Sequence, residues 1–394
     1  MPHPLSFAHY RDTPADRLAL QLAGRTDIDV PLILRQVEGW QRLRHKVPRW
    51  ADTEGVLFPP RLALEQCSGQ EAAAYKGQLA ARLCGAQTAA MADVTGGMGV
   101  DFSFMAPVFG RATYVERQEE LCTLARHNFP LLGVPHAQVV QAACEDFVPH
   151  MQPVDLIYLD PARRSTTGRK TVLLDDCTPN LTLLLPLLLA KARWVVAKLS
   201  PMLDVASALR TLHAVHEVHM VGADGECKEL LLVAGHDAPP EARRVVYNEG
   251  HTLSFTPADE ATAAPLYASR PLRYLLEPCA ALLKAGAFRF TAVHYGLHKL
   301  HQQAHLYTAD HLPAHFMGRT FSVVGCYGFS KPELRRLKHE VPQANLSVRG
   351  FPGSAEALRR RLKLRDGGAT YLFATTLADG SHALLACVKA QAKA

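Results

Sequence analysis

The chain has 394 residues, of which 48% are hydrophobic and 20% are charged, and its formal net charge is +6. This length predicts two or three domains, and the composition excludes a disordered or fibrous protein. The mild positive charge is compatible with nucleic acid but does not prove it. Nine cysteines without a C-x-x-C pair favour reduced thiols over a zinc site or a disulfide framework.

Neither the N-terminal residues nor the most apolar segment of the sequence indicates a membrane protein. The first residues, MPHPLSFAHYRDTPADR, resemble neither a secretory signal nor a transit peptide, so a cytoplasmic location is expected. The most apolar run, residues 181–190, is about half the length that spans a bilayer, and it contains a proline. We interpret it as a helix buried against a sheet. No membrane contact is expected, and the sequence identifies no stable protein partner.

The N-terminal region, residues 1–87, is predicted to be helical because apolar residues recur at helical spacing in 15–24, 30–47 and 68–85. Ser68 is the expected N-cap of the last of these helices, with Glu71 as its capping-box partner.

Residues 88–236 alternate short apolar strands with helices, which predicts a doubly wound, Rossmann-like α/β domain. The last two strands are separated only by DGEC and are expected to form a hairpin, so that one strand runs antiparallel to the rest. Residues 237–265 are predicted to be a linker containing a small hairpin.

The C-terminal part is predicted to contain a region at 266–318, mostly helical between 272 and 296, and a domain at 319–394. The expected order in the latter is strand, helix, strand, helix and a terminal hairpin, which suits a small α+β layer.

A glycine-rich turn, DVTGGMGVD at residues 93–101, follows the first predicted strand. Its glycines let the backbone approach a ligand closely, and the helix that follows offers a positive N-terminus. A purely structural turn is the alternative. Glu116 ends the second predicted strand, where an acidic residue commonly holds the two hydroxyls of a ribose. Together these features predict an adenosine-ribose site, with a solvated strand-end carboxylate as the other interpretation of Glu116.

The fourth predicted strand ends in YLDPARR, residues 158–164. An open parallel sheet presents its reacting groups at this edge. Asp160 and Pro161 begin a tight turn there, and Arg163 and Arg164 follow. Because the glycine turn also lacks the last glycine of G-x-G-x-x-G, S-adenosylmethionine is favoured over a nicotinamide dinucleotide.

With these motifs the chain resembles class I S-adenosylmethionine-dependent methyltransferases, and within them a bacterial family with a C-terminal THUMP-like domain. The resemblance covers most of the chain. It implies S-adenosyl-L-methionine as the cofactor, a seven-stranded sheet with a reversed final strand, and a C-terminal part that is ferredoxin-like at 266–318 and THUMP-like at 319–394. The blocks that carry it are LALEQCSGQEAAAYK, DVTGGMGVD, YVE, YLDPARR, AKLSPMLD, ECKELL, YLLEPCAALLKAGAF, KLHQQAHLYT and LRDGGATYLFATT.

The resemblance also implies roles for single residues. The glycine turn faces the methionine portion of the cofactor and Glu116 the ribose, while Glu145 and Asp146 approach the adenine, unless these two are ordinary acidic residues at a helix start. Asp160 lies beside the sulfonium and orients the acceptor for an in-line displacement. The expected cofactor-binding residues are Asp93, Thr95, Gly96, Gly97, Gly99, Asp101, Glu116, Glu145, Asp146 and Asp160.

The turn at Asp160 departs from the D/N-P-P-Y/F/W turn with which amino methyltransferases of this class orient an exocyclic amine. Alanine replaces the second proline and Arg163 replaces the aromatic residue. A guanidinium can stack on a base or bind phosphate, or it can pair with Asp175 or Asp176. The expected catalytic residues are Asp160, Pro161 and Arg163, and the expected substrate-binding residues are Arg163, Arg164 and Lys198.

Three further features have a structural interpretation beside a functional one. Lys228 and Glu229 are assigned to a structural salt-bridge network. His294, His298, His301 and His305 have a spacing that places them on one helical face, but a polar face or a nucleic-acid contact is favoured over a metal site. Residues 331–365 contain ten Lys or Arg and three Glu. Their leucines are expected in the core and their charges in solvent, where phosphate contact is possible.

The sequence thus predicts a cytoplasmic S-adenosylmethionine-dependent methyltransferase that acts by direct methyl transfer on a nucleobase in structured RNA. The alternatives are a methyltransferase of a small molecule or protein, an inactive RNA-binding protein that keeps the fold, and, ranked lowest, a nicotinamide-dependent oxidoreductase.

Overall fold

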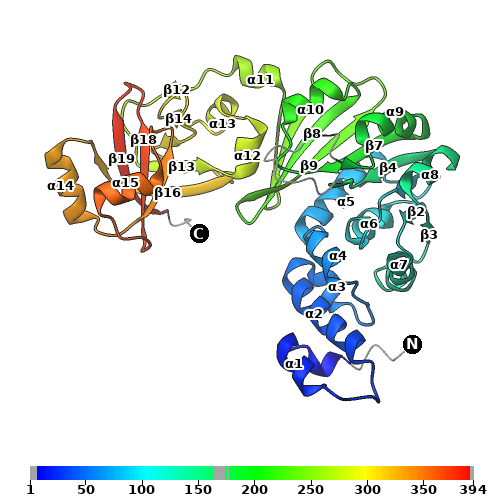
Figure 1. Cartoon of the computed structure of the whole chain (residues 1–394). Helices are drawn as coiled ribbons and strands as arrows, with labels where there is room; N and C mark the ends of the chain where they lie inside the picture. Colours follow the sequence, from blue (N-terminus) through cyan, green and yellow to red (C-terminus); the bar gives the residue numbers. More distant parts are fainter. Residues whose placement is uncertain (1–6, 164–173, 175–176, 391–394) are drawn as a thin grey trace. The chain divides into compact units, whose positions relative to one another are not determined.

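The computed structural model describes residues 7–163, 174 and 177–390. The chain divides into two compact units (Figure 1). The first comprises Met1–Val218 with Lys228–Ala242, and the second comprises His219–Cys227 with Arg243–Ala394.

The N-terminal region is helical, as predicted. Its longest helix, α2 (Val30–Lys46), begins after Asp29, whose carboxylate accepts a hydrogen bond from the Leu32 N–H at 3.0 Å. The helix ends with basic residues in its last turn. The prediction for Ser68 was wrong, because Gly69 is the N-cap of the fifth helix and the Ser68 hydroxyl is used elsewhere. The helices are α1 (Ala15–Gln21), α2 (Val30–Lys46), α3 (Pro48–Asp52), α4 (Arg61–Gln66) and α5 (Gln70–Cys84).

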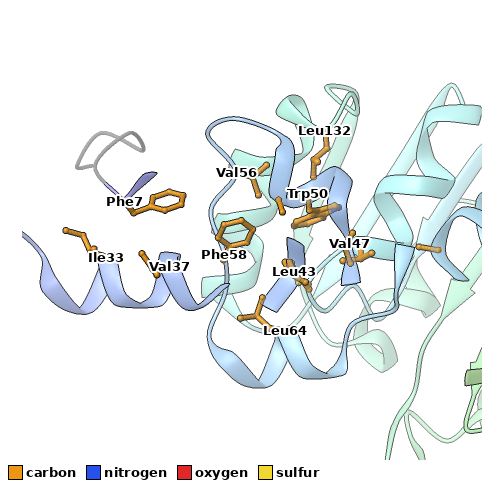
Figure 2. Close-up of a cluster of buried hydrophobic side chains, with 14 of the residues drawn as sticks. Phe7, Ile33, Val37, Leu43, Val47, Trp50, Val56, Phe58, Leu64 and Leu132 are labelled. Atoms are coloured by element: carbon orange, nitrogen blue, oxygen red, sulfur yellow. The ribbon is translucent and has the colours of Figure 1, made fainter. Parts of the chain in front are cut away.

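These helices share one hydrophobic core with the α/β domain. Figure 2 shows Leu132, which follows α7 (Glu119–Leu131) of that domain, among the same side chains as Trp50 and Val56. The fully buried indole of Trp50 donates a hydrogen bond to the Ser103 hydroxyl at 3.0 Å. Since removing the helices would expose this core, they are an integral part of the first unit.

The α/β domain contains the strands expected from the apolar runs. β1 and the end of β4 are buried continuously, as in strands covered on both faces. The strands are β1 (Ala90–Asp93), β2 (Arg111–Glu116), β3 (Ala137–Gln141), β4 (Val154–Leu159), β7 (Ala192–Leu199), β8 (Val215–Ala223) and β9 (Glu226–Gly235). The helices are α6 (Val100–Met105), α7 (Glu119–Leu131), α8 (Cys144–Phe147), α9 (Leu181–Lys191) and α10 (Val205–Thr211).

The strand order is β11-β10-β8-β9-β7-β4-β1-β2-β3. β1 pairs in parallel with both β2 and β4, so the order reverses between β1 and β4. β9 runs antiparallel to β7, and Asp224 and Gly225, both with positive φ, join it to β8 in the predicted hairpin. Ligands of open α/β sheets bind at the carboxyl ends of the strands beside such a reversal.

The prediction of seven strands was wrong in number, because the sheet has nine. The segment expected to be a linker contains a hairpin, β10 (Arg243–Asn248) and β11 (His251–Phe255), and the helix α11 (Pro257–Thr262). Val246 and Phe255 are buried, which explains why these short runs join a sheet. β10 follows β8 in the strand order, and the second half of β8 belongs to the same unit as the hairpin.

The second unit contains an eight-stranded sheet of order β12-β14-β15-β13-β16-β19-β18-β17. Its C-terminal part has the predicted order of elements, and the terminal hairpin β18–β19 is antiparallel. The strands are β12 (Leu266–Tyr267), β13 (Tyr274–Pro278), β14 (His298–Lys299), β15 (Tyr307–Ala309), β16 (Gly318–Tyr327), β17 (Asn345–Arg349), β18 (Thr370–Thr376) and β19 (His382–Lys389). The helices are α12 (Ala280–Ala285), α13 (Arg289–His294), α14 (Lys331–Glu340) and α15 (Ala355–Leu362).

Two predictions for this unit were wrong. The segment 272–296 begins with the buried strand β13 before its two short helices. The four histidines do not share a helical face, because α13 ends at His294 and His298 lies in β14. Among the described residues, no group of three or more His, Cys, Asp or Glu side chains could hold a metal ion.

The apolar run at 181–190 forms α9, as expected. Leu181, Leu185 and Leu188 are buried, whereas Leu183 is 78% exposed. In the part of the chain that the structure describes, no helix has both the length and the apolar character needed to cross a membrane.

One side chain offers a test of how the loop between α3 and α4 is held. Asn128 of α7 accepts a hydrogen bond from the Leu57 N–H at 2.9 Å and donates one to the Leu57 carbonyl at 2.8 Å. We expect Asn128→Ala to lower the free energy of unfolding by about 1–3 kcal/mol, because both backbone groups lose a partner. Urea unfolding followed by tryptophan fluorescence measures this, since Trp40, Trp50 and Trp194 all lie in the first unit.

The control is Arg61→Ala, which removes an exposed ion pair with Glu65. This loss should leave the free energy of unfolding close to that of the wild type, because exposed ion pairs contribute little. Equal effects of the two substitutions would contradict the role assigned to Asn128.

Candidate active site

The glycine turn leads from β1 into α6, and a different structural feature accounts for the glycine at each position. A Cβ on Gly96 would lie 2.2 Å from the ring of Tyr114, and one on Gly99 would lie 2.8 Å from Phe129, at a φ of +89°. Packing therefore requires these two glycines. Gly97 has a φ of +59°, but a Cβ there would meet no described atom closer than 3.8 Å. The turn is thus closed towards the core at Gly96 and Gly99 and open at Gly97.

Glu116 ends β2 and binds the same turn. Its carboxylate accepts hydrogen bonds from the Gly97 N–H and the Gln118 N–H, each at 2.8 Å. The side chain is largely buried. A carboxylate has about four lone-pair positions, so two remain for further donors. Glu116 therefore holds the glycine turn and can still accept hydrogen bonds from a ligand.

Asp93 and Thr95 connect the turn to the Asp160 segment. Asp93 ends β1, is 1% exposed, and accepts a hydrogen bond from the Thr95 N–H at 3.0 Å. Burial raises the pKa of Asp93 well above its ordinary value. The Thr95 hydroxyl accepts a hydrogen bond from the Asp160 N–H at 2.6 Å. The ends of β1 and β4 are thus joined where the strand order reverses.

Asp160 forms an ion pair with Lys198, which lies near the end of β7. The Lys198 Nζ is 2.5 Å from Asp160 Oδ2 and 3.9 Å from Asp101 Oδ2. Burial by itself lowers the pKa of Lys198, but Asp160, Asp101 and Glu229 outweigh it and raise the pKa above the ordinary value. Lys198 therefore acts as a permanent cation and not as a base.

A second lysine, Lys76, reaches this region from α5. It is 1% exposed, and its ammonium lies 2.5 Å from Glu229 Oε1 and 3.1 Å from Asp101 Oδ1. Its third contact is the Ser68 hydroxyl at 3.0 Å. The N-terminal region thereby supplies a cation that lies between two buried carboxylates of the α/β domain.

Asp101 is the member shared by both lysines. Its Oδ2 accepts hydrogen bonds from the Tyr158 hydroxyl at 2.7 Å and the Ser68 hydroxyl at 2.9 Å. Burial raises the pKa of Asp101, but Lys76, Lys198 and Tyr158 together lower it below the ordinary value. Asp101 is therefore ionised although it is buried.

The structure brings most of the predicted site residues to the carboxyl ends of β1, β2, β4 and β7. Glu145 and Asp146 lie in the first turn of α8, after β3, and both are exposed. Pro161 is buried directly after Asp160. The side chain of Arg163, together with Arg164, Asp175 and Asp176, lies outside the described residues. Glu229 is part of the ionic network, as predicted.

The analysis of the sequence missed Lys76, Ser68 and Tyr158. One signal was present, because Lys76 lies at helical spacing among Ala72, Ala73, Leu79 and Ala80, all of them buried. A lysine on an apolar helix face needs a buried partner. Nothing in the spacing identified that partner, which lies 153 residues away at Glu229.

The fold and the position of the site define a Rossmann-like domain of the class I methyltransferase type. Comparisons with known proteins agree with this class. A ferredoxin-like domain family matches residues 274–316, and a THUMP domain-like family matches residues 318–389. The solved structure of a protein from Porphyromonas gingivalis W83, assigned as a methyltransferase, is 36% identical and covers 98% of this chain and 96% of its own, with a TM-score of 0.85.

Two curated relatives from Mycobacterium tuberculosis, strains CDC 1551 and H37Rv, are named as uncharacterized S-adenosylmethionine-dependent methyltransferases. Each is 27% identical over 327 residues, covering 81% of this chain and 84% of the relative. The chain belongs to the class I S-adenosylmethionine-dependent methyltransferases that carry a C-terminal THUMP-like domain. It is a methyltransferase, and its cofactor is S-adenosylmethionine.

The residues at the carboxyl edge fit this cofactor chemically. Asp93, Glu116 and Asp160 provide carboxylates around the glycine turn, which suits a ligand with a cationic sulfonium, an ammonium group and a ribose diol. The open side of Gly97 leaves room for close approach of a ligand.

The buried ionic network yields a stability test. We expect Lys76→Met to lower the free energy of unfolding by about 3–5 kcal/mol, because Asp101 and Glu229 would stay buried without their cation. The control, Arg82→Ala, lies on the same helix and removes a pair with Glu217 in which the arginine is 52% exposed. It should cost less than about 1 kcal/mol. Urea unfolding followed by tryptophan fluorescence compares the two.

Lys76→Met should also change how the stability of the protein depends on pH in the acid range. The pKa of Asp101 is lowered below 3.8, so the stability it contributes is present above about pH 4 and is lost as the pH falls further. In Lys76→Met this acid-dependent loss should shrink. If the loss of stability at low pH were unchanged, the role assigned to the ionic network would be contradicted. A decrease in the free energy of unfolding no larger than that of Arg82→Ala would contradict it as well.

Proposed function

We propose that this methyltransferase transfers its methyl group to a nucleobase in structured RNA, by direct in-line displacement. The observation that carries the proposal is a basic and aromatic face on the THUMP-like domain. The two helices α14 and α15 bury their leucines, Leu337, Leu358 and Leu362, as predicted. Their basic side chains are exposed, among them Lys331, Arg335, Lys338, Arg360 and Arg361.

Aromatic rings accompany these charges. Phe329 and Phe351 stack with their centroids 5.2 Å apart, and both are half-buried. The Arg361 guanidinium lies 5.8 Å from the Phe329 centroid, and the exposed His382 ring lies 5.0 Å from that of Phe351. Unpaired bases of RNA stack on such rings while basic side chains contact phosphates. This combination favours RNA over a small molecule as the partner.

The chemistry at the sheet edge is consistent with direct transfer. The bound cofactor supplies the methyl group on a sulfonium, which needs no further activation. The chain contributes Asp160, half-exposed and held through its N–H by Thr95 and through its carboxylate by Lys198. Such a fixed carboxylate can orient an acceptor group, and orientation is the main requirement of an in-line displacement.

Binding of the cofactor product tests the site directly. We expect Glu116→Ala to weaken the binding of S-adenosylhomocysteine by roughly 1–3 kcal/mol in calorimetric titration, because a charged hydrogen-bonding partner is lost. The control is Glu119→Ala, an exposed carboxylate in the first turn of α7, which should leave the affinity unchanged. Absence of binding by the wild type, or equal effects of both variants, would contradict the assignment of Glu116.

RNA binding tests the substrate class. We expect the full chain to bind total RNA with a steep dependence on salt, and Arg360→Ala/Arg361→Ala to reduce the log–log slope by about one per removed phosphate contact. Filter binding over a range of salt concentrations measures the slope. Arg61→Ala, an exposed arginine of α4, serves as the control for loss of a positive charge outside the THUMP-like domain. Salt-independent binding, or none, would favour a small-molecule or protein methyltransferase instead.

A further inference from the structure

Asp160 and Lys198 place a hydrogen-bond acceptor and a hydrogen-bond donor side by side. Their charged atoms are 2.5 Å apart, and the two side chains are 38% and 14% exposed, so a ligand can reach them. The complementary edge on a nucleobase has a donor next to an acceptor. Two kinds of edge meet this requirement: the N–H and C=O of a lactam, and an exocyclic amine beside a ring nitrogen. Geometry alone therefore leaves two kinds of acceptor.

Hydrogen-bond counting leaves both kinds open. An exocyclic amine has two N–H groups and a lactam nitrogen has one. One oxygen of Asp160 is bound by Lys198, and a carboxylate has about four lone-pair positions, so donors of either kind can still bind it.

The charge of Lys198 separates the two kinds of acceptor. If the acceptor were an amine, the ammonium would bind the neighbouring ring nitrogen and withdraw electrons from the atom that must attack. If it is a lactam, the ammonium binds the carbonyl oxygen, where negative charge collects as the N–H proton leaves. Asp101, 3.9 Å from Lys198, keeps the ammonium in place. The same cation therefore disfavours attack by an amine and promotes attack by a lactam nitrogen.

We propose that the acceptor is the ring nitrogen of a lactam, as found in guanine and uracil, with Asp160 as the proton acceptor and Lys198 as the donor to the carbonyl oxygen. This inference rests on the proposed function, because it assumes a nucleobase substrate. The N–H proton passes to the Asp160 carboxylate. The ring nitrogen forms a bond to the methyl carbon, while the carbon–sulfur bond breaks and its electron pair stays on sulfur. The products are a neutral N-methyl lactam, neutral S-adenosylhomocysteine and a protonated Asp160, which releases its proton to water.

The identity of the methylated nucleoside tests this inference with the wild-type enzyme. Full-length protein is incubated with methyl-deuterated S-adenosylmethionine and total RNA from cells that lack the enzyme. The RNA is then digested to nucleosides and analysed by mass spectrometry. We expect label in N1-methylguanosine or N3-methyluridine. Label in N6-methyladenosine, N4-methylcytidine or N2-methylguanosine would overturn the lactam inference and leave RNA methylation intact. Absence of label in RNA would overturn the proposed function and this inference with it.

Substitution of Lys198 gives an independent readout. We expect Lys198→Gln to lower kcat about 10²- to 10³-fold, the range found when a donor to a developing oxyanion is removed. Its rate should remain independent of pH near neutrality, because Asp160 still accepts the N–H proton. Lys198→Arg keeps the charge and should retain most of the activity with a flat profile. Calorimetry should show S-adenosylhomocysteine bound within about threefold of wild type by both variants. A Lys198→Gln enzyme with undiminished kcat would overturn the role of Lys198.

Discussion

The buried ammonium of Lys76 is the contact on which the rest of the first unit depends. It lies between Asp101 and Glu229, two carboxylates on elements far apart in the chain. Two buried carboxylates without a cation would be expelled or protonated. Because Lys76 comes from α5, the N-terminal helices fix the charge state of the α/β domain. Asp101 is then ionised and can hold Lys198, and Lys198 can hold Asp160.

This dependence explains why carboxylates can gather at the edge where a cationic cofactor binds. Asp93 ends β1 and Glu116 ends β2, beside the glycine turn, and these acidic side chains favour a ligand with positive charge. Burial raises the pKa of Asp93, whereas Asp101 is kept ionised by its lysines. The protein thus separates a region that attracts the sulfonium from a region whose charges are already balanced.

Local patterns were sufficient for most of the fold and for part of the site. The continuous apolar runs located every strand from β1 to β9 that lies in the large sheet. The strand-end positions pointed to Glu116 and Asp160 as site residues, and the family resemblance added Asp93. Local patterns failed where contacts are distant in the sequence. Ser68 looked like an N-cap because its neighbours fit a capping box, but its hydroxyl binds Asp101 and Lys76. The run at β13 is too short to distinguish a strand from a helix without knowledge of its partners β15 and β16.

The same limit applies to the chemistry of the acceptor. In the sequence, the residues next to Asp160 were the obvious place to look, and the replacement of an aromatic residue by Arg163 left the acceptor undecided. The structure adds Lys198, 38 residues later in the chain, as the partner of the Asp160 carboxylate. A carboxylate that is already bound by a permanent cation is a different chemical group from an isolated one. Its preference for an acceptor follows from that pairing, and the tetrapeptide around Asp160 does not contain it.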